Sequence, residues 1–210
     1  WPGGPGGESA TSHSTHVTKG LSPATDWSLA FLSRLVQQGA RHIVVSPGSR
    51  SQALALAADA ISRRKDTSVE LHVVIDERSA GFFGLGAAIE SCQPTVLICT
   101  SGSAGAHYLP ALLEAKHSGV PLIAVTADRP EELLGVGANQ TTNQVGMFGP
   151  AAHAVFEVAT PDQTPSLKAD ARQLAGEVFS AALSGASHGR SGPVHVNVAF
   201  RDPLSAPVTE

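Results

Sequence analysis

One acidic residue, Glu77, lies in the segment VVIDERSAGFFGLGAA (residues 73–88), where an apolar run gives way to glycine and alanine. An acid in the first turn of a helix interacts favourably with the helix dipole, by roughly 0.3–1 kcal/mol, so a purely structural role is one interpretation. That role does not account for the small residues that follow, which predict a helix face open to close approach by another surface. These residues are Ala80, Gly81, Gly84, Gly86 and Ala87.

Two arginines lie in polar turns that follow apolar runs. Arg50 lies between Ser49 and Ser51 in the turn SPGSRS, and Arg129 lies in TADRP. A guanidinium binds a carboxylate or phosphate through two parallel hydrogen bonds, and neighbouring hydroxyls can add to them. Each arginine taken alone also fits an ion pair with a local acid on the surface. Two arginines at the same edge of a sheet favour a ligand with more than one acidic group.

Small and polar residues follow a third apolar run, in TSGSAGA (residues 100–106). A strand-to-helix turn of this composition exposes backbone N–H groups that can hold an anion, although a tight turn also needs small residues for steric reasons alone. The turn matches neither a Walker A loop nor the GxGxxG dinucleotide fingerprint. A long loop follows Arg129, and such loops in compact domains are more often functional than idle. It carries amides that can bind hydroxyls and carboxylates, namely Asn139, Gln140, Asn143 and Gln144.

The nine histidines show no spacing typical of a metal site, such as HExxH or HxH. His107 and His117, for example, are too far apart in sequence to share one turn of a helix face. We therefore predict no metal site made by this chain alone, and we interpret the histidines as scattered structural residues.

Apolar runs alternate with helical patterns along most of the chain. A helix is predicted from Ser22, a capping residue, to Gly39, and another from about 166 to 183. Continuous apolar strands separated by helices predict a doubly wound α/β domain with a six-stranded, mostly parallel sheet covered by helices on both faces. In such domains ligands bind beyond the carboxyl ends of the strands, where the polar turns described above would lie. The predicted strands are RHIVVS, VELHVVI, TVLICT, PLIAVT, HAVFEVA and GPVHVNVA.

Composition limits the classes of function. With 210 residues, 15% charged residues and a net charge of −4, the chain lacks the basic surface that nucleic acid or an anionic membrane would require. It has no signal peptide and no apolar run of about 18 residues, so we expect neither export nor a membrane span. Cys92 and Cys99 form no CxxC pair and fit a reduced cytoplasmic location.

Three segments are expected. Residues 1–21 are rich in glycine, serine, threonine and proline and predict a poorly packed arm. Residues 22–202 form the α/β domain, and residues 203–210 form a tail or a linker to further domains. Because the chain begins with Trp1 rather than methionine, we expect it to be an excised piece of a longer protein.

Taken in order, SPGSRS, IDERSAGFFGLGAA, TSGSAGA and PLIAVTADRPEELLGVGANQTTNQVGMFG resemble the N-terminal domain of the MenD family, thiamine-diphosphate-dependent synthases of menaquinone biosynthesis. The resemblance runs from about residue 25 to 200, and the combination DRP…GANQT is highly specific. It implies a pyrimidine-binding domain in which Glu77 hydrogen-bonds N1′ of the cofactor's aminopyrimidine and acts in catalysis. It also implies that the turn Thr100, Ser101 and Gly102 contacts the cofactor, and that the substrates contact Ser49, Arg50, Arg129, Asn139 and Gln140.

The same resemblance implies the reaction and its requirements. Members of the family decarboxylate 2-oxoglutarate and add the resulting four-carbon unit to isochorismate, using thiamine diphosphate with Mg²⁺ or Mn²⁺. The Gly-Asp-Gly motif that anchors metal and diphosphate does not occur in this chain. The active site of the family forms between this domain and the diphosphate domain of a second subunit. We therefore expect a homodimer or homotetramer for the whole enzyme, and no activity from this chain alone.

Two alternatives remain at the level of the sequence. One is another thiamine-dependent lyase, such as an acetolactate synthase or a 2-oxoacid decarboxylase, which shares the strand and glutamate but not DRP joined to GANQT. The other is a binding or regulatory module of thiamine-enzyme ancestry. Such a module would have no reason to keep Glu77 together with Arg50 and Arg129.

Overall fold

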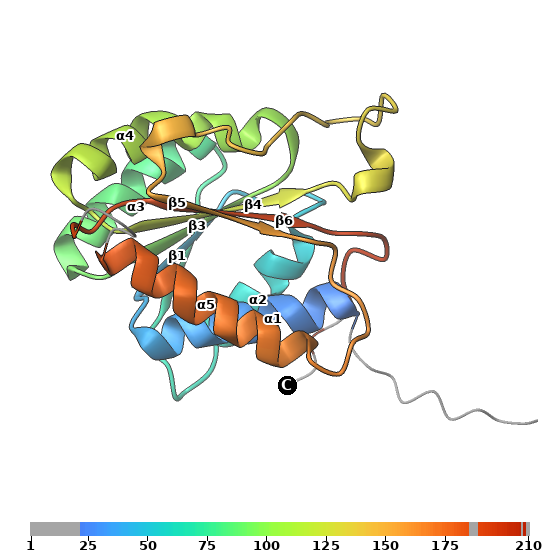
Figure 1. Cartoon of the computed structure of the whole chain (residues 1–210). Coiled ribbons are helices and arrows are strands. Elements are labelled where there is room, and N and C mark those ends of the chain that lie inside the picture. Colours follow the sequence, from blue (N-terminus) through green and yellow to red (C-terminus); the bar gives the residue numbers. More distant parts are fainter. Residues whose placement is uncertain (1–21, 185–188, 207, 209–210) are drawn as a thin grey trace, which may run out of the picture.

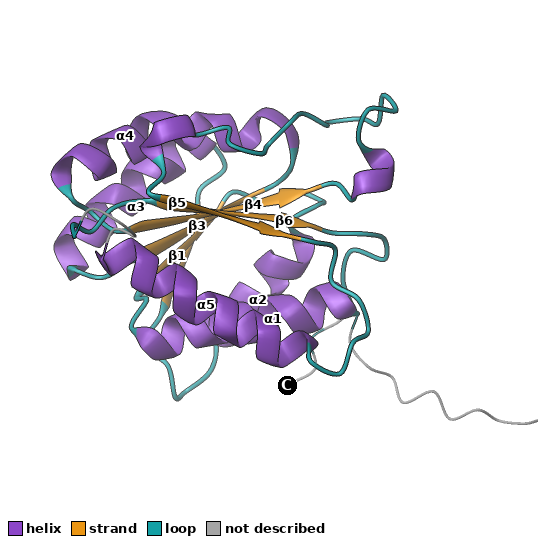
Figure 2. Cartoon of the chain, viewed as in Figure 1, coloured by secondary structure: helices purple, strands orange, loops and turns teal. Residues whose placement is uncertain are grey.

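The computed structural model describes residues 22–184, 189–206 and 208, so the predicted arm at 1–21 lies outside the described residues. Six parallel strands form one sheet in the order β2-β1-β3-β4-β6-β5. This confirms the predicted doubly wound α/β fold, with every strand pair parallel (Figures 1 and 2). The strands are β1 (His42–Val45), β2 (Glu70–Val73), β3 (Thr95–Cys99), β4 (Leu122–Asp128), β5 (Ala154–Val158) and β6 (Val194–Ala199).

Helices cover both faces of the sheet (Figure 2). One face packs against α1 (Pro23–Gln38), α2 (Gln52–Ser62) and α5 (Leu167–Ser184). The other packs against α3 (Glu77–Ser91), the 3₁₀ helix η1 (Gly102–Tyr108) and α4 (Leu109–Ser118). Two shorter 3₁₀ turns, η2 (Glu131–Leu133) and η3 (Gly149–Ala151), lie before β5. None of the helices in the described part of the chain is long and apolar enough to cross a bilayer.

The first helix, α1, shows how sequence signals set an element's bounds. The Ser22 hydroxyl accepts a hydrogen bond from the Thr25 N–H, and Pro23 occupies the first helical position, where it needs no N–H partner. Gly39 ends the helix at φ +122°, a backbone conformation that favours glycine. The predicted start and end of this helix are therefore confirmed.

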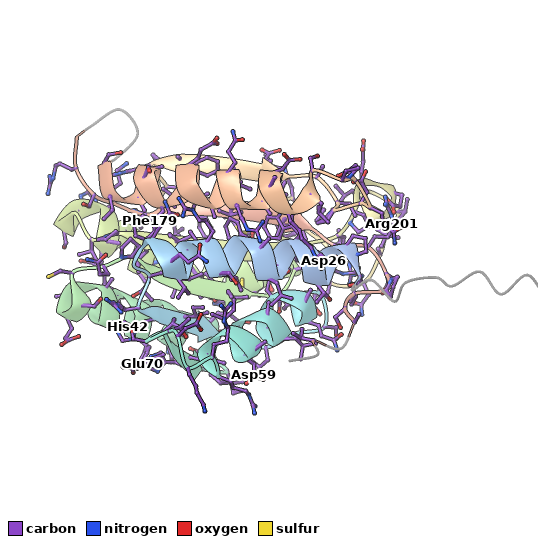
Figure 3. All side chains as sticks on the ribbon, turned by 90° about the horizontal axis from the view of Figure 1, so that it is seen from below. Asp26, His42, Asp59, Glu70, Phe179 and Arg201 are labelled. Atoms are coloured by element: carbon purple, nitrogen blue, oxygen red, sulfur yellow. The ribbon has the colours of Figure 1, made fainter. Side chains whose placement is uncertain are left out.

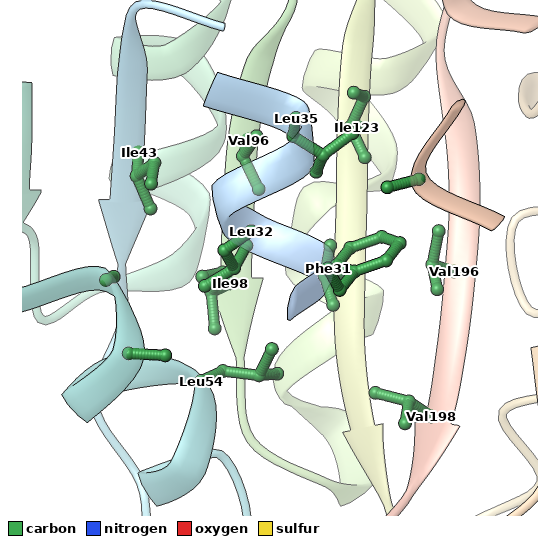
Figure 4. Close-up of a cluster of buried hydrophobic side chains, with 14 of the residues drawn as sticks. Phe31, Leu32, Leu35, Ile43, Leu54, Val96, Ile98, Ile123, Val196 and Val198 are labelled. Carbon is green, nitrogen blue, oxygen red and sulfur yellow. The ribbon is translucent and has the colours of Figure 1, made fainter. Parts of the chain in front are cut away.

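Alternate strand residues feed two separate cores because side chains of a strand point to opposite faces. Ile98 of β3 packs toward α1, while the preceding Leu97 packs toward α3. Figure 4 shows the larger core, where Phe31, Leu32 and Leu35 of α1 lie against the sheet. The sheet side chains that they meet include Val96, Ile98, Ile123, Val196 and Val198.

The strand order reverses direction next to β1. After β1 the chain crosses outward to β2, and then α3 carries it back past β1 to β3 and on to β4. A crevice at the carboxyl ends of the strands forms at such a switch point, because the loops that leave the two neighbouring strands diverge to opposite faces. The turns after β1 and β3, at residues 46–51 and 100–102, therefore flank the expected ligand crevice.

Three of the five small residues of α3 pack against this chain itself and not against the second surface that was predicted. A Cβ added to Gly84 would lie 2.3 Å from Leu97 Cδ2, and one added to Gly81 would lie 3.1 Å from Ala111 Cβ. These glycines and the buried Ala80 thus let α3 pack closely on the chain's own β3 and α4, not on a second surface. The exposed side of α3 carries Gly86 together with the large Phe82, Phe83 and Ile89.

Candidate functional site

Glu77 is the first residue of α3 and lies half-buried just beyond the end of β2. The preceding Asp76 caps the helix by accepting hydrogen bonds from the Ser79 N–H and hydroxyl at 2.8 and 2.7 Å. The cap function therefore belongs to Asp76, which leaves the Glu77 carboxylate without it. Among the described residues, none donates a hydrogen bond to that carboxylate or forms an ion pair with it. A carboxylate in this position is available to a ligand.

Two buried neutral groups lie within electrostatic reach of Glu77. Burial raises the pKa of the Cys99 thiol, and the negative charge of Glu77 raises it further. Burial likewise raises the pKa of the Tyr108 hydroxyl, with smaller contributions from Cys99 and Glu77. Both groups therefore stay protonated at neutral pH. Two buried groups that carry no charge at neutral pH thus lie near Glu77.

The turns after β1 and β3 are in direct contact at the switch point. A Cβ added to Gly48 would lie 2.3 Å from Thr100 Cβ, so only glycine allows this approach. Thr100, Ser101 and Gly102 are all buried in the described chain. The predicted cofactor turn and the predicted Ser49–Arg50 turn are therefore neighbours.

The long loop after β4 folds back onto the Thr100–Gly102 turn. The Ser101 hydroxyl donates to the Gln140 carbonyl, and the Gln140 side-chain amide donates to the Ser101 carbonyl, both at 3.1 Å. Gly102 has φ +82°, and a Cβ there would lie 2.9 Å from Gln140 Cγ. The residues predicted to contact cofactor and substrate thus form a single unit.

Gln144 fastens the same turn to the sheet. Its buried side-chain carbonyl accepts the Gly102 N–H at 2.8 Å, and its amide donates to Asn197 Oδ1 and to the Ala127 carbonyl. From sequence Gln144 was only one of several amides suited to a ligand, whereas the structure gives it a positioning role. The loop is rich in polar residues, so its composition did not predict that Gln144 would be buried.

A buried polar network continues from Gln144 into β4 and β6. Thr126 donates to Asn197 Oδ1 at 2.8 Å, so its oxygen accepts the hydrogen bond from His195 Nε2, also at 2.8 Å. Asn197 in turn donates to Asp128 Oδ2. Phe148 packs edge-on against the His195 ring, and no described residue hydrogen-bonds the buried Nδ1. Protonation of His195 would therefore place a charge in the core with a second N–H donor, at Nδ1, that has no partner among the described residues.

This network predicts a loss of stability in mild acid. Burial lowers the pKa of His195 to about 4, whereas the unfolded chain protonates this histidine near pH 6.5. Between these values the unfolded state binds one more proton, so the free energy of unfolding falls as pH falls from 6.5 to 4, by about 2–3 kcal/mol from this residue. Urea unfolding at several pH values should show this slope. His195→Gln should reduce the dependence of unfolding free energy on pH, whereas the control His117→Asn, at an exposed position, should leave it unchanged. Equal pH dependence in the unmodified chain and both variants would contradict the role assigned to His195.

The two predicted arginines lie at the same sheet edge, within electrostatic reach of each other. Burial lowers the pKa of Arg50, and the positive charge of Arg129 lowers it further, partly offset by Asp202. Arg50 Nη1 donates to the Phe200 carbonyl at 2.8 Å and lies 3.5 Å from the Asp202 carboxylate. The buried Arg50 Nε has no hydrogen-bond partner among the described residues. A nearby pair of guanidinium groups suits an anionic ligand.

The remaining predicted substrate residues are more exposed. Arg129 Nε donates to the Asn139 carbonyl at 2.7 Å, which leaves its terminal N–H groups free for a ligand. The Ser49 and Asn139 side chains are solvent-exposed. The structure thus brings Arg50, Arg129 and the loop amides to one edge, together with Glu77 and the Thr100–Gly102 turn. The Arg50 contacts with residues after β6 were missed, because sequence patterns do not report contacts across 150 positions.

Comparison with known proteins identifies a family to which this chain is similar. Residues 26–147, more than half of the chain, match the family described as "Thiamine pyrophosphate enzyme, N-terminal TPP binding domain". That range includes every predicted site residue.

Curated relatives carry one shared name, 2-succinyl-5-enolpyruvyl-6-hydroxy-3-cyclohexene-1-carboxylate synthase. The protein from Leifsonia xyli is 50% identical over 186 residues, which is 89% of this chain and 31% of the relative. The proteins from Thermobifida fusca and Bacillus velezensis are 45% and 44% identical, over 88% and 87% of this chain and 32% and 30% of their own lengths. The chain thus spans about a third of the length of these relatives. It belongs to the thiamine pyrophosphate enzyme family, as an N-terminal TPP-binding domain similar to that of these synthases.

Proposed function

We propose that this chain is the pyrimidine-binding domain of a transferase that decarboxylates 2-oxoglutarate and joins the remaining four-carbon unit to isochorismate in menaquinone biosynthesis. The observation that carries the proposal is the 50% identity to a synthase of that name over 89% of the chain. The unpartnered Glu77 carboxylate and the pair Arg50 and Arg129 at one sheet edge support it. With its cysteines free, the enzyme fits the reduced cytoplasm.

The site residues fit thiamine diphosphate on structural grounds. Gly48 and Gly102 let the turns after β1 and β3 and the loop after β4 pack together at one edge. The Glu77 carboxylate at that edge has no partner of its own among the described residues. When bound, the cofactor supplies the carbon nucleophile needed to decarboxylate a 2-oxo acid. Glu77 would share a proton with N1′ of the aminopyrimidine, because a carboxyl group facing apolar surroundings can exchange a proton with a weakly basic nitrogen. The turn Thr100–Gly102 would line the ring.

The arginines would orient the two substrates, both of which are dicarboxylates. Arg50 is fixed by the Phe200 carbonyl and still has a buried Nε–H to offer. Arg129 Nε donates to the Asn139 carbonyl, which leaves its two terminal nitrogens, Nη1 and Nη2, to bind a carboxylate. Fixed guanidinium groups bind carboxylates with little loss of side-chain freedom. Ser49, Asn139 and Gln140 would supply further hydrogen bonds to substrate.

The rest of the site would come from domains outside this chain. The sequence has no Gly-Asp-Gly motif, so Mg²⁺ or Mn²⁺ and the diphosphate would be held by a diphosphate domain of a second subunit. Large apolar side chains exposed near Glu77 support such an assembly, because isolated domains rarely expose so many together. They come from the end of β2 and from α3, namely Val73, Ile75, Phe82, Phe83 and Ile89. We infer a homodimer or homotetramer and an inactive isolated chain.

The test is CO₂ release from 2-oxoglutarate by the complete protein and by this chain, with thiamine diphosphate and Mg²⁺, with and without isochorismate. We expect the complete protein to release CO₂ in step with isochorismate loss, and this chain to be silent. Preference for pyruvate with no use of isochorismate would point to another thiamine-dependent lyase. Turnover of neither 2-oxo acid, with the cofactor bound, would favour a regulatory module.

A further inference from the structure

Three side chains that can bind metals converge on the opposite end of the sheet from the site described above. His42 is the first residue of β1, and its register partner in the neighbouring parallel strand β2 is Glu70. His72 lies two residues after Glu70 and therefore on the same face of the sheet. Figure 3 shows His42 and Glu70 together at one end of the molecule, with Arg201 at the other.

The spacing of the three ligand atoms is close to that of a metal site. His42 Nδ1 lies 3.1 Å from His72 Nε2, which lies 3.8 Å from Glu70 Oε2, and all three atoms lie within 4.8 Å of one another. Tetrahedral zinc with bonds of about 2.0–2.2 Å places its ligands roughly 3.3 Å apart. The two imidazoles already satisfy this separation. The Glu70 side chain is solvent-exposed and needs only a small rotation to satisfy it as well.

Packing fixes the two imidazole rings in this arrangement. The His72 ring lies between His42 and Phe83 of α3, with ring centroids 5.3 and 4.7 Å away, respectively. Both histidines are half-buried, so their rings have little freedom to turn away.

We propose that His42, Glu70 and His72 form a site for a divalent transition metal, with Zn²⁺ as the first candidate. Two imidazoles and one carboxylate are a ligand set typical of zinc, and the fourth position stays open to water. Mg²⁺ and Ca²⁺ prefer oxygen ligands and should bind here weakly. In the described part of the chain, this is the one cluster of three or more histidine, cysteine or acidic side chains with such spacing. A bound metal would tie the edge strand β2 to β1.

The competing explanation is an ordinary hydrogen bond. A 3.1 Å separation also fits an N–H of one imidazole donating to the other, with no metal involved. The two explanations differ in their response to added metal. A hydrogen-bonded pair would gain nothing from zinc, whereas a metal site would bind it with a defined stoichiometry.

The test is a titration of this chain, after chelator treatment, with ZnCl₂ by isothermal calorimetry, with MgCl₂ as the comparison metal. The background is His13→Asn/His16→Asn, which removes two further histidines in residues 1–21 as alternative zinc ligands. We expect one zinc per chain with a micromolar or lower Kd, an upward shift of the thermal midpoint, and no such response to MgCl₂. Substituted Co²⁺ should give the strong visible absorption of tetrahedral coordination.

Variants decide whether these three residues are the ligands. His72→Asn and Glu70→Gln should each weaken zinc binding, by at least about 100-fold for the histidine. His117→Asn, an exposed histidine on α4, should leave the Kd unchanged. Glu70 is exposed, so its variant will fold even where a histidine variant does not. Unchanged zinc binding in both Glu70→Gln and a folded His72→Asn, or no binding to the background protein, would overturn the proposal.

Discussion

Replacing Glu77 with glutamine in the complete enzyme should lower turnover by about 10²–10⁴-fold, the range typical of losing a positioned acid or base. The glutamine side chain keeps the shape of glutamate but cannot share an acidic proton with N1′ of the bound cofactor. The helix should be unaffected, because Asp76 and not Glu77 makes the capping hydrogen bonds to Ser79. Steady-state CO₂ release from 2-oxoglutarate, with isochorismate present, measures the effect.

The matched control is Glu90→Gln, which makes the same change in the last turn of the same helix, at an exposed position. Its turnover should equal that of the unmodified enzyme. Circular dichroism and the urea midpoint should be the same for both variants. A Glu77→Gln enzyme with a near-normal rate would refute the role proposed for Glu77 while leaving the family assignment intact.

Replacing Gly84 with valine should lower the free energy of unfolding by about 4 kcal/mol, above the usual cost of overpacking. The added Cβ would lie 2.3 Å from Leu97 Cδ2 and 3.3 Å from Thr95 Cγ2. Both partners are fully buried on β3, which is hydrogen-bonded on both sides and cannot move away. Either the fully buried Leu97 side chain must repack or helix α3 must shift, and a shift of α3 would move Glu77 at its start. Urea unfolding of this chain, monitored by circular dichroism, measures the loss.

Gly86→Val is the control for the Gly84 variant. Gly86 lies in the same helix, is exposed, and has no heavy atom within 4 Å of the place that a Cβ would occupy. Valine is a better helix former than glycine, so this variant should be unchanged or slightly more stable, by less than about 1 kcal/mol. Equal losses at both positions would mean that α3 does not pack on β3 through Gly84.

The order of elements could be predicted from sequence because its signals are local. Apolar runs of four to seven residues, the Ser22 cap and the Gly39 stop act within a few positions. The strand-to-helix turn predicted at residues 100–106 continues into the 3₁₀ helix η1, Gly102–Tyr108. Its Gly105 is pressed against Met147 and Thr126, contacts that come from other parts of the chain. Contacts of this kind have no local signature.

The sequence led to the residues of the candidate site but not to the contacts among them. Family motifs led to Glu77, Arg50 and Arg129, which the fold brings to one edge. The glycines of α3 were misinterpreted because a small-residue face looks the same whether it meets a partner or the chain's own sheet. The His42–His72 pair was missed because the search was for ligands close together in sequence, and these lie on two strands.

The paired hydrogen bonds between Ser101 and Gln140 make the two halves of the site energetically dependent on each other. Ordering the turn at Thr100–Gly102 also orders the loop that holds Asn139 and Arg129, since the two segments share these bonds. By thermodynamic reciprocity, a ligand bound at the turn changes affinity at the loop by some factor, and a ligand bound at the loop changes affinity at the turn by the same factor. Under the roles proposed for the turn and the loop, mutation cannot adjust cofactor affinity and substrate affinity one at a time.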